Sequence, residues 1–198
     1  HIPGVSDLDL VAVTRGPVDE TRQAVLAELH PRWDRWTLGC VYVDGDRLDD
    51  REAAHPTWTH GMLVQRILSG ITRAELVTFG RAVFGREPRE ILPPMTADDI
   101  RTAARAELTG YWRWAARRPW MWLNPVIADL SLTSMARGRH AVRTGTLLTK
   151  SAAVEQAAAP QWLIDQLRAR RHGEPRTSPR LRTAWTAWRD ARRTTRRP

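Results

Sequence analysis

The sequence predicts an α+β protein, with a mixed α/β region near its amino terminus and a bundle of helices after it. Two observations support this. Residues 6–46 read as strand, helix, strand in that order, the core of an α/β unit. From residue 96 to about 173, apolar positions instead recur at helical spacing. The chain has 198 residues, enough for one large or two small domains with their own cores.

The first strand is expected in SDLDLVAVTRG and ends at Gly16. A helix is expected over DETRQAVLAELH, and a second strand over WTLGCVYVDGD, closed by the Asp-Gly turn at residues 44 and 45. The inward-facing residues of that helix are expected to be Val25, Leu26 and Leu29. Residues 60–70 and 73–85 have mixed apolar periodicity and are compatible with either helix or strand.

A domain boundary is expected at Pro93 and Pro94, because Thr96 and Asp99 then form the T-x-x-D pattern of a helix start. We therefore predict a first domain over residues 1–95, a helical bundle over 96–173 and a basic tail over 174–198. The expected core residues of the bundle are Leu108, Trp112, Ile127, Leu130, Met135, Leu163 and Leu167.

The net charge of +9 is unevenly placed along the chain. Residues 174–198 hold eight arginines against one glutamate and one aspartate, so most of the excess is in the tail. Trp185 and Trp188 can anchor a terminal helix against the bundle, or the segment can be disordered. Because cationic segments with aromatics bind phosphate backbones and stack bases, nucleic-acid binding by this tail is one functional hypothesis.

Composition excludes several classes of site. Cys40 is the only cysteine, which excludes internal disulfides and cysteine-based zinc sites, and the six histidines show no ligand spacing. No apolar run has the length of a membrane span and no signal pattern is present, so a cytoplasmic location is expected. The sequence does not begin with Met, and we expect its natural start to be missing.

Two aspartates, Asp7 and Asp9, interrupt the apolar run of the first expected strand. Side chains alternate between the faces of a strand, so both carboxylates fall on one face, about 7 Å apart. Carboxylates that close repel each other unless a cation lies between them, and Mg²⁺ is commonly held by one or two carboxylates with water and substrate phosphates. The pattern indicates a magnesium site, or else two aspartates that face solvent at a sheet edge.

The one lysine of the chain, Lys150, lies at the expected start of an alanine-rich helix that ends before Pro160. Thr149 or Ser151 is expected to cap this helix. A cation is unfavourable there by about 0.3–1 kcal/mol, but a bound anion reverses the effect. Arg137, on the preceding helix, can reach the same place. These residues indicate a phosphate site, or alternatively a solvated surface lysine.

These segments resemble a known family. SDLDLVAV looks like the D-x-D strand of the nucleotidyltransferase (polymerase β-like) superfamily, and the remainder resembles its streptomycin and spectinomycin adenylyltransferase branch, which adds a carboxy-terminal helical bundle. FGREPREILPPMTADDIRTAARAELTGYW is similar to the segment leading into the first bundle helix of that branch. LSLTSMARGRHAVRTGTLLTKSAAVEQA is similar to its arginine-to-lysine motif, in which Arg137 precedes Lys150 by thirteen residues. The resemblance covers most of residues 4–173.

The resemblance implies transfer of AMP from Mg²⁺-ATP to a hydroxyl of an aminoglycoside-like molecule. Residues 1–95 would form the catalytic domain, with the site in a cleft between the two domains. Asp7 and Asp9 would bind Mg²⁺, Ser6 would contact the nucleotide, and Arg137 and Lys150 would hold the triphosphate. Trp58 can pack on the acceptor, although core packing is the alternative for a tryptophan.

The third carboxylate of the family, its general base, falls on Gly39 in this alignment, and Asp44 at the end of the same strand is the nearest substitute. The Gly-Ser motif of the family, upstream of the D-x-D strand, is absent, and a nucleotide-contacting aspartate falls on Leu68. Loss of a general base commonly costs about 10²–10⁴ in rate. A second hypothesis is therefore a degenerate relative that binds nucleotide or a partner without transferring AMP.

Overall fold

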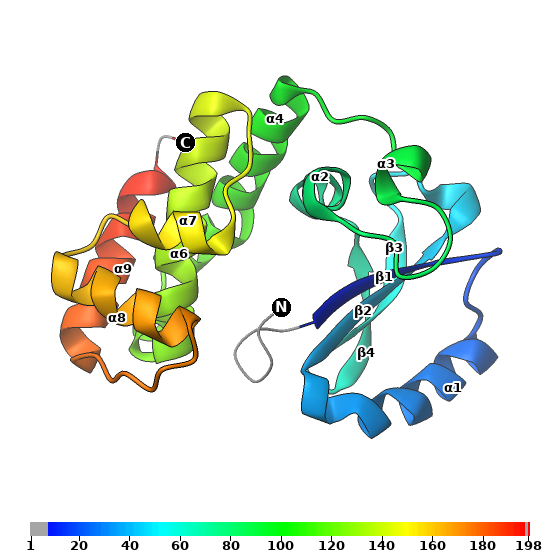
Figure 1. Cartoon of the computed structure of the whole chain (residues 1–198), viewed down its shortest axis with the longest axis horizontal. Coiled ribbons are helices and arrows are strands. Elements are labelled where there is room, and N and C mark those ends of the chain that lie inside the picture. Colours follow the sequence, from blue (N-terminus) through cyan, green and yellow to red (C-terminus); the bar gives the residue numbers. More distant parts are fainter. Residues whose placement is uncertain (1–7, 197) are drawn as a thin grey trace. The chain divides into compact units, whose positions relative to one another are not determined.

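The computed structural model of the chain describes residues 8–196 and residue 198 (Figure 1). The chain divides into two compact units. The sheet unit comprises the residues up to Arg73 together with Arg81–Pro93, and the helical unit comprises Ala74–Gly80 and Pro94–Pro198. The helix α2 (Gly70–Phe79) passes from one unit to the other.

The sheet unit is built on a four-stranded sheet in the order β1-β2-β3-β4. Its strands are β1 (Leu8–Thr14), β2 (Leu38–Asp44), β3 (Ala54–Thr59) and β4 (Met62–Ile67). Its helices are α1 (Glu20–Leu29), η1 (His30–Trp36), η2 (Gly45–Arg47) and α3 (Pro88–Ile91). β1 and β2 are parallel and the other neighbours are antiparallel, so the expected strand, helix, strand unit is confirmed.

The expected helix after β1 begins at its Asp19 cap, whose carboxylate accepts a hydrogen bond from the Arg22 amide at 2.9 Å. Leu26 and Leu29 are half-buried, but the expectation for Val25 was wrong, since 58% of its surface is exposed. Of the two ambiguous segments, 60–70 contains the strand β4, and residues 73–79 of the segment 73–85 belong to the helix α2.

The sequence analysis made no prediction for β3, a strand that contains Pro56. In the structure Pro56 pairs with Gln65 of β4, whereas pairing with β2 involves only Thr57 and Trp58. No ladder bond on the β2 side therefore needs the amide hydrogen that proline lacks.

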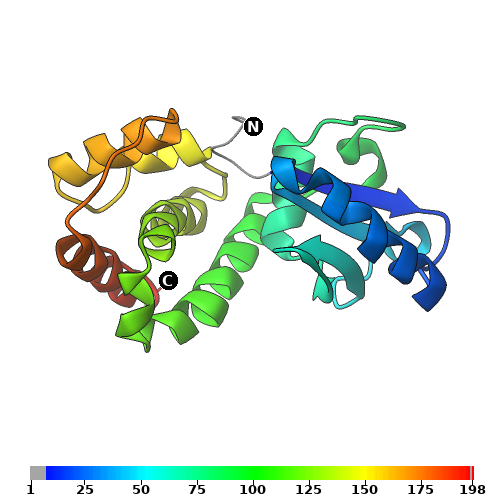
Figure 2. The same cartoon turned by 90° about the horizontal axis from the view of Figure 1, so that it is seen from below.

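The helical unit surrounds the long helix α6 (Pro125–Thr144). In Figure 2, α6 lies between α4, α9 and the α7–α8 pair. The other elements are α4 (Ala97–Glu107), η3 (Leu108–Trp112), α5 (Arg113–Ala116), η4 (Pro119–Leu123), α7 (Lys150–Glu155), α8 (Gln161–Arg171) and α9 (Arg180–Thr194). Thr96 and Asp99 form the expected capping box of α4. In the described part of the chain, every helix is too short or too polar to cross a membrane.

The core of the helical unit contains most of the residues expected there. Five of them are buried: Leu108, Trp112, Met135, Leu163 and Leu167. Ile127 is half-buried, and the expectation for Leu130 was wrong, since it is 48% exposed. Leu130 lies about 200° around α6 from the buried Ala128, on the opposite side of the helix.

The basic tail forms a helix that packs in the bundle. The small residues Ala184, Ala187 and Ala191 of α9 are buried, which allows close packing against α6. The indole N–H of Trp188 donates to the carbonyl of Ala116 at 2.9 Å. Trp188 is thus an anchor, whereas Trp185 is 59% exposed.

Candidate functional site

Asp9 is an exposed residue of β1, which is an edge strand of the described sheet. In the parallel pairing of β1 with β2, Asp9 lies directly opposite Gly39. A Cβ atom at position 39 would lie 2.9 Å from Asp9 Oδ1, so the missing side chain leaves the room that this carboxylate occupies. Asp7 and Ser6, the other predicted residues of this strand, lie outside the described residues.

A small pocket of about 150 Å³ in the sheet unit includes Asp9. Its walls come from the start of β2 and from the turn between β3 and β4, and they include Gly39, Trp58 and His60. The pocket thus brings together two of the predicted site residues, Asp9 and Trp58.

Trp58 is held by a buried aromatic cluster. It is 4% exposed and stacks on His30, with ring centroids 4.8 Å apart and planes at 11°. His30 Nε2 lies 2.7 Å from the hydroxyl of Tyr42. Burial lowers the pKa of His30 and raises the pKa of Tyr42, so both groups are held neutral near pH 7. Core packing therefore accounts for most of the Trp58 side chain, while its remaining surface lines the pocket.

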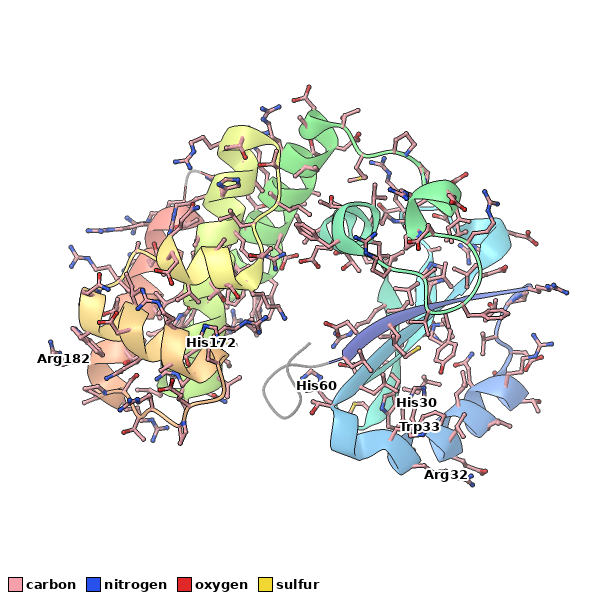
Figure 3. All side chains as sticks on the ribbon, viewed as in Figure 1. His30, Arg32, Trp33, His60, His172 and Arg182 are labelled. Carbon is pink, nitrogen blue, oxygen red and sulfur yellow. The ribbon has the colours of Figure 1, made fainter. Side chains whose placement is uncertain are left out.

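Two polar residues of this pocket were not selected by sequence reasoning, namely Thr59 at the end of β3 and His60 in the turn to β4. Figure 3 labels His60. His60 has a φ of 51° and Gly61 a φ of 75°, the positive values typical of a two-residue hairpin turn. A hydrogen bond of 2.8 Å joins Thr59 Oγ1 to His60 Nδ1. The His-Gly pair between two strands is the signal in the sequence that could have located this turn.

Asp44, expected above to be the nearest substitute for a carboxylate at position 39, does not lie near Gly39. It lies five residues further along β2, a distance of about 16 Å along a strand. Its carboxylate accepts a hydrogen bond of 3.2 Å from the Asp46 amide and caps η2. Leu68, on which a nucleotide-contacting aspartate falls, is 2% exposed and belongs to the core.

Asp9 is the one carboxylate among the described residues that line this pocket, and it fits Mg²⁺ only as part of a larger ligand set. Among the side chains that the structure describes, no group of three or more histidine, cysteine or acidic residues is placed to hold a metal. Asp9, exposed beside Gly39, supplies one oxygen donor group. That fits an ion that takes most of its ligands from water and substrate phosphates, which is common for Mg²⁺.

Arg137 and the segment before Lys150 lie together in the helical unit. The Arg137 guanidinium projects from α6, donates from Nε to the carbonyl of Leu148 at 3.0 Å, and forms a salt bridge with Glu75 of α2. Lys150 is exposed at the first position of α7. Of the two expected caps of this helix, Thr149 and Ser151, the structure has Thr149. The predicted pair is therefore brought to one loop, although Arg137 also has an acidic partner.

The turn between Arg137 and Lys150 requires glycine. Gly145 ends α6 with a φ of 71°, and a Cβ atom there would lie 2.6 Å from the Cβ of Ala97 at the start of α4. This close approach fixes the direction in which the chain leaves α6 toward Lys150.

One solved structure to which the chain is similar is "Crystal structure of spectinomycin adenyltransferase AAD(9) from Enterococcus faecialis with ATP and spectinomycin". The superposition has a TM-score of 0.65 and covers 95% of this chain and 84% of that one. The chain has the fold of a nucleotidyltransferase. The sequence identity is 13%, so the likeness extends to the fold and not to the substrate. No protein-family model and no curated protein matches the sequence.

Each unit of this nucleotidyltransferase fold contains part of the predicted site. The sheet unit holds Asp9 and Trp58 at one pocket, and the helical unit holds Arg137 and Lys150 at one loop. The first pair offers an oxygen donor and an aromatic surface, and the second offers two cations.

Proposed function

We propose that the protein transfers AMP from Mg²⁺-ATP to a hydroxyl group of a small, polyhydroxylated, aminoglycoside-like molecule. The observation that carries the proposal is the shared fold, which extends over 95% of this chain and over both of its units. The similar enzyme was crystallised with ATP and spectinomycin. The D-x-D strand and the Arg137–Lys150 motif add residues of the right chemistry.

Asp9, together with Asp7, would hold Mg²⁺, with Ser6 contacting the nucleotide. Bound Mg²⁺ neutralises the charge that develops on the phosphates. Asp9 suits this role because it is exposed at the pocket and Gly39 leaves its carboxylate room. Arg137 and Lys150 would neutralise the triphosphate. The hydrogen bond from Arg137 to Leu148 holds the Arg137 guanidinium beside the loop that ends at Lys150.

The acceptor would lie against Trp58, with its hydroxyl oxygen directed at the α-phosphorus. A bond forms between that oxygen and the α-phosphorus, the bond to the β-phosphate oxygen breaks, and pyrophosphate leaves. The hydroxyl proton must go to a base, and the carboxylate of the family is replaced by Gly39. His60 lies on the wall of the same pocket, and its Nε2 can accept the proton when Nδ1 donates its hydrogen to Thr59 Oγ1.

Gly39 also favours a second function, that of a degenerate relative that binds nucleotide or a partner without transferring AMP. In that case ATP binds but no adenylylated product forms.

The nucleic-acid hypothesis is weaker, because one side of α9 is buried in the bundle and does not form a free basic segment. A reaction that consumes ATP is consistent with the expected cytoplasmic location.

The experiment that tests the proposal is calorimetric titration with ATP, with and without Mg²⁺, repeated with spectinomycin or streptomycin present. Mg²⁺-dependent binding that tightens with one antibiotic supports the transferase, and mass spectrometry of the antibiotic then shows whether it gains AMP. Binding without adenylylation supports the degenerate relative. Absence of ATP binding by the folded protein contradicts both.

Two substitutions assign the triphosphate contact to Lys150. Lys150→Ala is expected to weaken ATP binding about tenfold with little change in melting temperature, because the side chain is exposed. Lys150→Arg keeps the charge and is expected to retain most of the affinity. An unaltered dissociation constant in Lys150→Ala would show that this lysine is only a surface residue.

A further inference from the structure

A second and larger pocket lies in the helical unit, where the α5–η4 segment meets the carboxy-terminal end of α9. Its volume is about 570 Å³, within the range of small-molecule sites. Figure 2 shows α9, in brown, beside the green chain of α5 and η4. Among the described residues, no carboxylate lines the pocket, and its charged residues are Arg113, Arg117, Arg192 and Arg196.

Several arginines elsewhere in this unit are paired with acids. Arg139 lies 2.6 Å from Asp190, and Arg170 lies 2.7 Å from Asp129. Within the part of the chain that the structure describes, the four arginines of the pocket form no salt bridge. Four cations gathered without counter-charge repel one another, and an anion in the pocket relieves that repulsion.

Two of the guanidinium groups are held in place by contacts that leave some of their N–H groups available. Arg113 donates from Nε and Nη2 to the carbonyl of Thr195, at 2.9 and 2.7 Å, and its Nη1 is not used in this contact. Arg192 lies over the ring of Trp188, 5.0 Å from its centroid, and Trp188 is itself anchored to Ala116. Groups ordered before a ligand arrives cost less entropy to engage.

We propose that this pocket binds a small anion with a chain of two or three phosphates. Planar guanidinium groups bind phosphate oxygens through paired hydrogen bonds, so several of them around one pocket suit several linked phosphates. The charge is concentrated in a pocket of small-molecule size and not spread along a stripe, which favours a small polyphosphate over a nucleic-acid strand. The site contains neither Arg137 nor Lys150, so it is independent of the proposed transferase reaction.

The test is calorimetric titration of the whole chain with inorganic tripolyphosphate, without Mg²⁺ and at low salt. The variant Arg117→Ala/Arg196→Ala removes two exposed arginines and leaves Arg113 and Arg192 in their contacts. It is expected to bind about 100-fold more weakly, about tenfold for each guanidinium. The control Arg105→Ala/Arg189→Ala removes the same charge from exposed positions outside the pocket and is expected to bind within about twofold of the parent chain.

Other ligands and one further variant separate the explanations. Lys150→Ala is expected to leave tripolyphosphate binding intact, and loss of binding in that variant would assign the phosphate to the proposed active site and overturn the pocket. Similar affinities for tripolyphosphate and ATP indicate that the pocket recognises the phosphate chain alone. Tighter binding of ATP, if it still requires Arg117 and Arg196, indicates that the ligand of this pocket is a nucleotide. Equal losses in the two double variants, or tighter binding of a single-stranded oligonucleotide lost in the pocket variant, would overturn the proposal.

Discussion

Asp9 and Gly39 lie directly opposite each other on β1 and β2, and a Cβ atom at position 39 would come within 2.9 Å of Asp9 Oδ1. The absence of a side chain on one strand therefore determines where the carboxylate of the other can lie. Position 39, where the resemblance would place the general base of the family, thus lies beside Asp9.

The metal role of Asp9 predicts that Asp9→Asn abolishes Mg²⁺-dependent ATP binding and leaves the melting temperature within a few degrees, because the residue is exposed. Asp49→Asn, at another exposed position of the sheet unit, is the control and is expected to change neither quantity. Gly39→Ala is expected to weaken Mg²⁺-ATP binding several-fold by displacing the Asp9 carboxylate. Calorimetry measures all three, and wild-type affinity in Asp9→Asn would exclude this metal role.

The salt bridge from Arg137 to Glu75 predicts a coupling in stability that is separate from any nucleotide contact. Arg137→Lys keeps the charge but loses the guanidinium group, whose nitrogens contact both Glu75 and the carbonyl of Leu148. The free energy of unfolding is therefore expected to fall by about 1–2 kcal/mol. A double-mutant cycle with Glu75→Gln is expected to give a coupling energy of about 1 kcal/mol. Denaturant unfolding checks this, and additive effects would show that the pair does not interact.

The buried imidazole of His30 predicts that stability falls with acid. Its pKa is lowered by burial, so between that lowered pKa and about 6.5 the unfolded chain binds a proton that the folded chain does not. Stability is therefore fully present above pH 6.5 and is lost as the pH falls, by up to about 1.4 kcal/mol per pH unit for this group. His55, whose pKa burial also lowers, acts in the same direction.

Comparison of the parent chain with His30→Phe isolates this contribution. The phenylalanine ring can keep the stacking on Trp58 but has no proton to gain, so the loss of unfolding free energy between pH 7.5 and 5.5 is expected to be smaller in the variant. His172→Phe, at an exposed histidine after α8, is the control. Equal pH dependence in parent and His30→Phe would show that His30 takes up its proton without unfolding.

The packing of α9 predicts that the basic tail is required for stability. Ala187 is fully buried against the bundle, so Ala187→Asp places an unpaired charge in the core and is expected to cost about 3 kcal/mol or more. Arg189→Asp introduces the same carboxylate at an exposed position of the same helix and is expected to cost less than about 1 kcal/mol. Thermal unfolding followed by circular dichroism compares them, and equal melting temperatures would contradict the packing of α9.

Local patterns predicted those parts of the fold that depend on neighbouring residues. The cap formed by Thr96 and Asp99 is a contact between residues three apart, and Thr149 caps its helix in the same way. The sequence analysis made no prediction for β3. Its Pro56 is accommodated because this residue pairs with Gln65 of β4 and has no partner in β2, which is a property of the sheet and not of the local sequence. Val25 and Leu130 were misplaced because an apolar residue at helical spacing need not face a partner.

By itself, the sequence determined the strand, helix, strand order of residues 6–46, the helical region after residue 96, the α+β class and the residue types of the candidate site. Periodicity, caps and short motifs are local properties of a chain, so they can be read without the fold. Only the tertiary structure decided that Asp9 shares a pocket with Trp58 and His60. It also decided that Arg137 forms a salt bridge with Glu75 and a hydrogen bond with the carbonyl of Leu148. Finally, it brought four arginines of α5, α9 and the residues that follow these helices to one pocket. These contacts join residues far apart in the chain, and strand register and helix packing bring them together.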